Sequence, residues 1–168
     1  MVADVRAAVA ELARRAGELG ADPRGITVIG HSAGGHLVAM LMTTDWSAHG
    51  LPPDTVGAGL AISGLYDLEP IRRSYVNDEI GMTERDAHDA SPVRTTPTAP
   101  GPLLLTCGGD EPGEFDRQQR LLARTWPTLP VTILDQCDGT HFDACDRLAR
   151  PGRLRDAALA LVRDRAGR

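Results

Sequence analysis

Apolar and polar positions follow two different rhythms along the chain. Short runs rich in Ile, Val and Leu have the length of buried strands and lie at 26–29, 56–62, 103–106 and 131–134. Around them, apolar residues recur at helical spacing near 5–19, 37–42, 114–126 and 154–162. Strands that alternate with helices favour a parallel sheet with helices on both faces. The pattern therefore predicts an α/β fold, a three-layer sandwich around a mostly parallel sheet of about four strands.

The first and last predicted helices each carry apolar residues on one face. The stripe of the first helix consists of Val5, Val9, Leu12, Ala16 and Leu19. The stripe of the last helix consists of Leu154, Ala158, Leu161 and Val162.

Residues 66–100 form an irregular stretch between the second and third strands. It holds several prolines, both tyrosines and a short helix with a cap signal near Thr83 and Asp86. Long excursions from α/β sheets tend to form lids or binding loops. We interpret 66–100 as a lid over the active site; the alternative is a surface insertion without a role.

Composition points to one soluble domain over residues 1–168. Hydrophobic residues make up 42% and charged residues 24%, and the net charge is −5. All 18 basic residues are arginine and lie dispersed among carboxylates, so no basic patch predicts nucleic-acid binding. Arginine usage with abundant Ala and Gly suggests a GC-rich bacterial source. No apolar run approaches the roughly 20 residues of a membrane span, and no secretion signal opens the chain. We expect a cytoplasmic protein without membrane partners.

Cys107, Cys137 and Cys145 are odd in number and none forms a C-x-x-C pair. Neither a disulfide framework nor a zinc site is therefore expected. We expect buried thiols, no metal and no cofactor.

The sequence Gly30-His31-Ser32-Ala33-Gly34 is a G-x-S-x-G placed between a β-branched strand and an apolar helix. This context predicts a sharp turn that lifts the Ser32 hydroxyl above the sheet. Bulky neighbours are expected to clash there, which accounts for both glycines. Ser32 is the predicted nucleophile, and the alternative is a Gly-rich turn with an incidental serine.

A serine nucleophile needs a base and a carboxylate that orients the base, here in the chain order Ser, Asp or Glu, His. Asp110 is the first carboxylate after the third strand, and Glu111 and Glu114 are alternatives. His141 is the only histidine after Asp110 and is the predicted base. The predicted triad is Ser32, Asp110 and His141.

Two histidines flank the serine, and two more precede the acid. His31 and His36 are expected to serve as packing or hydrogen-bonding supports, and His49 and His88 have no assigned role. The backbone N–H of Ala33 is the expected first donor of the oxyanion hole.

Together these segments resemble the kynurenine formamidase (arylformamidase) branch of the α/β-hydrolases. The matching segments are 30–36, 63–71, 74–78, 114–119 and 141–143. The resemblance implies hydrolysis of N-formyl-kynurenine to kynurenine and formate in tryptophan breakdown, without metal or cofactor. It also implies the triad Ser32, Asp110 and His141. The stretch 111–115 is one residue longer than the usual form, which leaves the alignment of the acid open.

The resemblance also implies elements that do not precede Val5. Family members have about four more strands and a His-Gly-Gly segment that donates the second oxyanion hydrogen bond. We interpret the chain as the C-terminal part of the fold, a fragment or a shortened form. The strand at 26–29 should then have an unpaired edge that invites homodimerisation or aggregation. Loss of one oxyanion donor typically costs about 10²–10³ in turnover, so weak or absent activity is expected.

Two further functions stay open on the sequence. One is a carboxylesterase that acts on small acyl esters through the same triad. The other is an inactive truncated remnant.

Overall fold

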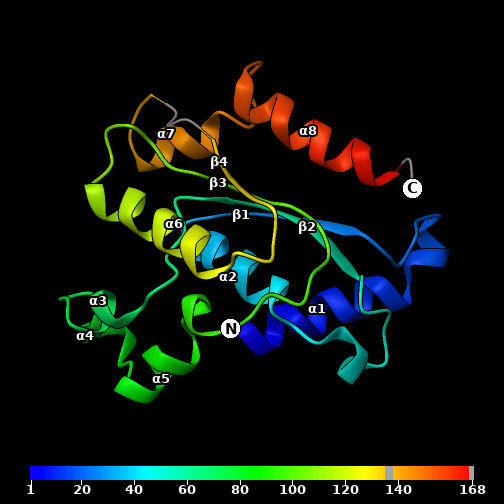
Figure 1. Ribbon diagram of the computed structural model, residues 1–168, viewed down its shortest axis with the longest axis horizontal. Helices are drawn as coiled ribbons and strands as arrows, with labels where there is room; N and C mark the ends of the chain where they lie inside the picture. Colours follow the sequence, from blue (N-terminus) through cyan, green and yellow to red (C-terminus); the bar gives the residue numbers. More distant parts are fainter. Residues whose placement is uncertain (135–137, 167–168) are drawn as a thin grey trace.

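Four parallel strands form the centre of the molecule (Figure 1). The computed structural model describes residues 1–134 and 138–166. The strands are β1 (Ile26–His31), β2 (Val56–Ile62), β3 (Leu103–Thr106) and β4 (Val131–Ile133). They lie in the order β1-β2-β3-β4, and every neighbouring pair is parallel. The predicted parallel α/β architecture is confirmed.

The register of the strands aligns their carboxyl ends at one rim of the sheet. His31 pairs with Ile62, and Ile62 pairs with Thr106. The ladder continues one residue further, because the N–H of Ser32 donates to Ile62 O at 2.9 Å and that of Ser63 to Thr106 O at 2.8 Å. Open α/β sheets place their functional sites at this rim.

Helices cover both faces of the sheet. On one face lie α1 (Val2–Arg14), α2 (Ala33–Met42) and α6 (Gly113–Thr125), whose apolar residues share a cluster with Ala61, Leu103 and Leu105. On the other face lie α7 (His141–Asp146) and α8 (Arg153–Ala166), which contact Ala58, Leu60 and Ile62. Figure 1 shows α7 and α8 on the side of the sheet opposite α1, α2 and α6. Residues of β2 thus contribute to two hydrophobic clusters, one on each face of the sheet, because successive side chains of a strand point to opposite faces.

The two terminal helices bury only part of their apolar stripes. In α1 the buried residues are Val9, Ala10 and Ala13, and the 3₁₀ helix η1 (Ala16–Leu19) follows it. Leu12 is 46% exposed and Leu19 60%, and Val162 of α8 is 46% exposed. These three side chains lie at the border of the buried face, where solvent still reaches them.

The stretch 66–100 contains more regular structure than expected. It holds α3 (Glu69–Arg72), α4 (Asn77–Ile80), α5 (Glu84–Asp89) and the 3₁₀ helix η3 (Pro92–Arg94). The predicted cap is confirmed, since Thr83 and Asp86 form a reciprocal capping box at α5. Trp126 after α6 anchors the far end of the stretch, because its Nε1 donates to Thr95 O at 2.9 Å. A short 3₁₀ helix, η2 (Trp46–His49), precedes β2.

The cysteines differ in their surroundings. Cys107 is buried, as expected, whereas Cys145 is exposed, contrary to expectation. Cys145 lies on α7, whose neighbour Ala144 faces the core instead. Cys137 lies outside the described residues. Within the described ranges, no helix is long and apolar enough to cross a membrane.

Candidate active site

Ser32 occupies the junction between β1 and α2 in a strained conformation. Its φ is 57° and its ψ −119°, a region that residues other than glycine rarely adopt. The strand ends at His31 and the helix begins at Ala33, so the turn consists of Ser32 alone. The predicted sharp strand-to-helix turn is present at this serine.

Only the first glycine of the G-x-S-x-G is needed for space. A Cβ on Gly30 would overlap the backbone carbonyl of Gly34, whereas a Cβ on Gly34 would meet nothing within 4 Å. The expectation that both glycines avoid clashes is therefore wrong for Gly34. The second crowded glycine is Gly35, whose Cβ would lie 2.9 Å from the Cα of Gly64. Gly30 and Gly35 let the turn and α2 pack closely on the sheet.

His141 is brought beside this turn from the other end of the chain. It is the first residue of α7, whose start is fixed by Thr140 and Asp143. The Thr140 N–H donates to Asp143 Oδ2 at 2.9 Å. His31 Nε2 donates to the backbone O of His141 at 2.8 Å, and the two imidazole ring centres lie 4.4 Å apart. The predicted base therefore contacts the residue that precedes the predicted nucleophile.

The carboxylate in contact with His141 is that of Glu111, not that of Asp110. His141 Nδ1 lies 2.9 Å from Glu111 Oε2. A turn explains the difference: the N–H of Glu111 donates to Gly108 O at 3.3 Å, so Asp110 lies at the exposed tip. Glu111 follows the tip and points back into the protein. The sequence-based choice of Asp110 is corrected to Glu111 at this contact.

The Glu111 carboxylate is buried and well supplied with donors. Its side chain is 1% exposed. Oε1 accepts from Ser63 Oγ at 2.5 Å and from the N–H of Gly108 at 2.6 Å, and Oε2 faces His141. A buried carboxylate is stable as an anion when several donors surround it. Glycine at 108 is required by packing, because a Cβ there would lie 2.5 Å from Gly139 O.

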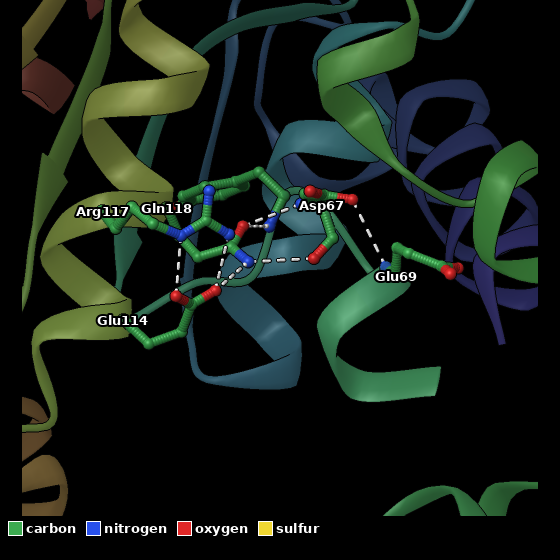
Figure 2. A network of polar contacts seen from close by, with 6 residues as sticks. Asp67, Glu69, Glu114, Arg117 and Gln118 are labelled. Atoms are coloured by element: carbon green, nitrogen blue, oxygen red, sulfur yellow. Dashed lines mark hydrogen bonds and ion pairs between the residues drawn. The ribbon is translucent and has the colours of Figure 1, made fainter. Parts of the chain in front are cut away.

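Glu114, the third candidate acid, has a different environment. It accepts from Arg117 Nε at 2.7 Å and from Gln118 Nε2 at 2.8 Å (Figure 2). The hydrogen bond from Arg117 lowers the pKa of the Glu114 carboxyl. The partners of Glu114 thus lie on its own helix, α6. The Glu111 carboxylate is the one that contacts His141.

The hydrogen bonds fix which nitrogen of His141 carries a proton. A carboxylate accepts only, so Nδ1 of His141 is the protonated nitrogen when the imidazole is neutral. Nε2 then has a free lone pair and can accept a proton. This is the tautomer that a general base requires.

The other histidines make structural contacts outside the His141–Glu111 pair. His36 Nε2 donates to Ala90 O at 2.7 Å and so links α2 to the end of α5. Burial lowers the pKa of His36. The supporting contacts expected of His31 and His36 are both present. His49 lies against Trp46, and His88 is an exposed partner of Asp89.

Aromatic rings surround the imidazole of His141. The ring of Phe115, from α6, lies 5.0 Å from it, and that of Phe142 lies 5.7 Å away in an edge-on orientation. Phe142 is 79% exposed despite its size. Sequence reasoning noted Phe115 and Phe142 only through the family resemblance and gave Ser63 no role. The strand ends carried the missing signal, because Ser63 directly follows β2 as Ser32 follows β1.

No group suited to a metal ion is found among residues 1–134 and 138–166: three or more His, Cys, Asp or Glu side chains nowhere gather in a fitting arrangement.

Comparison with known proteins places this site in a family. A family model described as BD-FAE matches residues 1–103. The chain belongs to the BD-FAE family. Among curated proteins it is 32% identical to the kynurenine formamidase of Salmo salar over 156 residues, and 32% identical to that of Danio rerio over 155 residues. These matches cover 88% of the chain and 51% of each fish enzyme, so this BD-FAE chain spans about half their length.

Solved structures show the same fold. A putative thioesterase from Silicibacter superposes with a TM-score of 0.68 at 25% identity, over 91% of this chain and 56% of that one. The thermostable carboxylesterase EstE1 from a metagenomic library gives a TM-score of 0.67 at 23% identity, over 99% and 63%. This BD-FAE chain has the α/β-hydrolase fold and belongs to its kynurenine formamidase-like branch. The resemblance inferred from sequence is confirmed.

Proposed function

We propose that this chain carries the catalytic centre of a serine hydrolase in which Ser32 is the nucleophile, His141 the base and Glu111 the orienting carboxylate. One observation carries the proposal: Ser32, at positive φ on the sheet rim, directly follows His31, which contacts His141, and the Nδ1 of His141 faces a buried carboxylate. Backbone strain and buried charge pairs cluster at functional sites.

The proposed reaction is acyl transfer in two steps. Ser32 Oγ attacks the carbonyl carbon while His141 Nε2 takes its proton, and Glu111 stabilises the imidazolium through Nδ1. The N–H of Ala33, the first residue of α2, is proposed as one donor to the developing oxyanion. His141 then returns the proton to the leaving amine or alcohol, and a water molecule releases the acyl group from Ser32.

A pair of adjacent substitutions tests the assignment of the acid. Glu111→Gln removes the charge that faces His141 and should slow fluorophosphonate labelling of Ser32 by roughly 10³–10⁴. Asp110→Asn, one residue earlier at the exposed tip, should change the rate less than about threefold. Ser32→Ala gives the background. A larger loss in Asp110→Asn than in Glu111→Gln would return the role to Asp110.

The substrate class that we propose is an N-formyl aryl amide, as in N-formyl-kynurenine. Two relatives bear the name kynurenine formamidase, and the rings of Phe115 and Phe142 flank His141 where an aryl group could stack. Hydrolysis of N-formyl-kynurenine would release formate and kynurenine without a metal or cofactor. A second copy of the chain is a further proposed partner.

A carboxylesterase is the second candidate, because solved esterases share the fold. Rates on N-formyl-kynurenine and p-nitrophenyl acetate separate the two functions. In an arylformamidase, changes in the proposed lid, residues 66–100, should slow the first reaction and spare the second. Equal effects on both substrates, with faster turnover of the ester, would favour the esterase.

Covalent labelling by a fluorophosphonate tests whether Ser32 is reactive at all. Labelling that is lost in Ser32→Ala supports a catalytic site, and absence of labelling would contradict the proposal.

A further inference from the structure

Ser63 lies at the rim of the sheet between the nucleophile and the acid. It directly follows β2, as Ser32 follows β1, and the register pairs the last residues of the two strands, His31 and Ile62. On its other side, its N–H donates to Thr106 O of β3, two residues before Gly108. Ser63 thus lies between the turn that carries Ser32, after β1, and the turn that carries Glu111, after β3.

The backbone of Ser63 is held in a strained conformation. Its φ is 50°, and among described residues other than glycine only Ser32 shares a positive φ. Glycine adopts such a conformation at little cost, so a serine there needs another explanation. The contact of the Ser63 hydroxyl with Glu111 supplies that explanation.

The hydroxyl of Ser63 is committed to the carboxylate. Ser63 is 1% exposed, and its Oγ donates to Glu111 Oε1 at 2.5 Å. The second donor to Oε1, the N–H of Gly108, belongs to the same turn as Glu111 and moves with it. Ser63 is therefore the donor to Oε1 that ties the carboxylate to a separate, central strand.

We infer that Ser63 is a positioning residue of the proposed triad, which fixes the Glu111 carboxylate so that Oε2 meets His141 Nδ1. The inference rests on the proposed function and adds to it a fourth residue. With Oε1 bound to Ser63 at the end of β2, the carboxylate cannot rotate away from the imidazole without losing a buried charge-assisted hydrogen bond. Ser32 and Ser63 then follow two neighbouring strands of one sheet, so the nucleophile and the residue that positions the acid share one support.

Three variants separate positioning from mere structural support. Ser63→Ala removes the hydroxyl, and Ser63→Gly removes it while relieving the positive φ. Thr55→Val is the matched control: Thr55 immediately precedes β2, is 0% exposed, and its Oγ1 donates to Pro52 O at 2.7 Å. The control removes a buried hydroxyl at the opposite end of the same strand.

Two readouts apply to each variant, together with the melting temperature. The first is the second-order rate of fluorophosphonate labelling of Ser32. The second is the downfield proton NMR signal of His141 Nδ1–H, which reports its bond to Glu111 whether or not the chain turns over substrate. We expect both Ser63 variants to be labelled about tenfold more slowly than the unmodified chain and to lose or shift this signal. Ser63→Gly should melt no lower than the unmodified chain, and Thr55→Val should keep rate and signal.

Two results would overturn the inference. In the first, Ser63→Gly keeps the labelling rate and the Nδ1 signal that Thr55→Val shows. In the second, the unmodified chain lacks the Nδ1 signal. No labelling of the unmodified chain, or labelling that survives Ser32→Ala, overturns the proposed function instead. In that case the Nδ1 signal alone decides whether Ser63 orders the Glu111–His141 pair.

Discussion

At the scale of single residues, the turn at the rim packs closely because glycine stands where a Cβ would meet the backbone. The turn that carries Ser32 folds back so tightly that the Cα of Gly30 faces the carbonyl of Gly34. Four residues further, the same backbone has turned into α2 and Gly34 faces open space. Two glycines of one motif therefore have unequal importance.

A pair of alanine substitutions tests this difference. Gly30→Ala should destabilise the protein by about 3 kcal/mol or more, because its Cβ forces the backbone of the turn apart. Gly34→Ala should stabilise it by about 0.5–1 kcal/mol, since alanine favours a helix and meets no neighbour. Urea unfolding gives both values, and labelling of Ser32 should survive only in Gly34→Ala. Equal damage by the two substitutions would contradict the packing argument.

At the scale of elements, one side chain of α6 holds the start of the 66–100 stretch. Gln118 is 0% exposed, and its Oε1 accepts from the N–H groups of Tyr66 and Asp67, both at 2.8 Å. Its Nε2 donates to Asp67 O at 2.9 Å. Figure 2 shows Gln118 of α6 directed at Asp67, with Glu114 and Arg117 on the same helix. The amide replaces the backbone partners that a strand or helix would supply there.

Gln118→Met should therefore be far more damaging than the same change at its neighbour Gln119. Methionine keeps the volume but leaves three backbone groups of residues 66–67 without their partner, at a cost of about 2–4 kcal/mol. Gln119 is also buried, at 2%, yet its amide nitrogen donates to side chains, those of Asp116 and Cys107. Thermal unfolding and limited proteolysis within 66–100 measure the effect. Equal loss in both variants would show that general burial, not the backbone contacts, stabilises this stretch.

At the scale of the whole molecule, the edge of the sheet formed by β1 carries exposed apolar side chains. Among the described residues β1 pairs with β2 alone, and Ile29 of β1 is 43% exposed. On α8, which packs against β1 and β2, Leu159 and Val162 are 38% and 46% exposed. A strand with free hydrogen-bonding groups and apolar neighbours favours pairing with another chain.

We predict that the chain, prepared alone, self-associates through β1. Ile29→Arg should weaken association about tenfold or more, because a charge on an edge strand disfavours pairing. Leu19→Arg is the control, since Leu19 is 60% exposed on η1 and lies outside the sheet. Sedimentation velocity over a range of concentrations measures both. A monomer at every concentration, or equal effects of the two variants, would rule out the β1 edge as the interface.

The sequence by itself determined the parallel sheet, the turn at Ser32 and the family, because strand composition, helical spacing and the G-x-S-x-G are local patterns that one segment carries. The single candidate histidine after the third strand likewise led directly to His141. These features depend on residues close together in the chain, and short-range physics decides them.

Only the tertiary structure decided which carboxylate faces that histidine and what holds it. Asp110 and Glu111 are adjacent in sequence, and the turn closed by Gly108 sends one into solvent and the other inward. Ser63 reaches Glu111 across 48 residues of chain, through the register of β2 and β3. No local pattern encodes such a meeting, because it is the parallel sheet that brings the ends of distant strands to one rim.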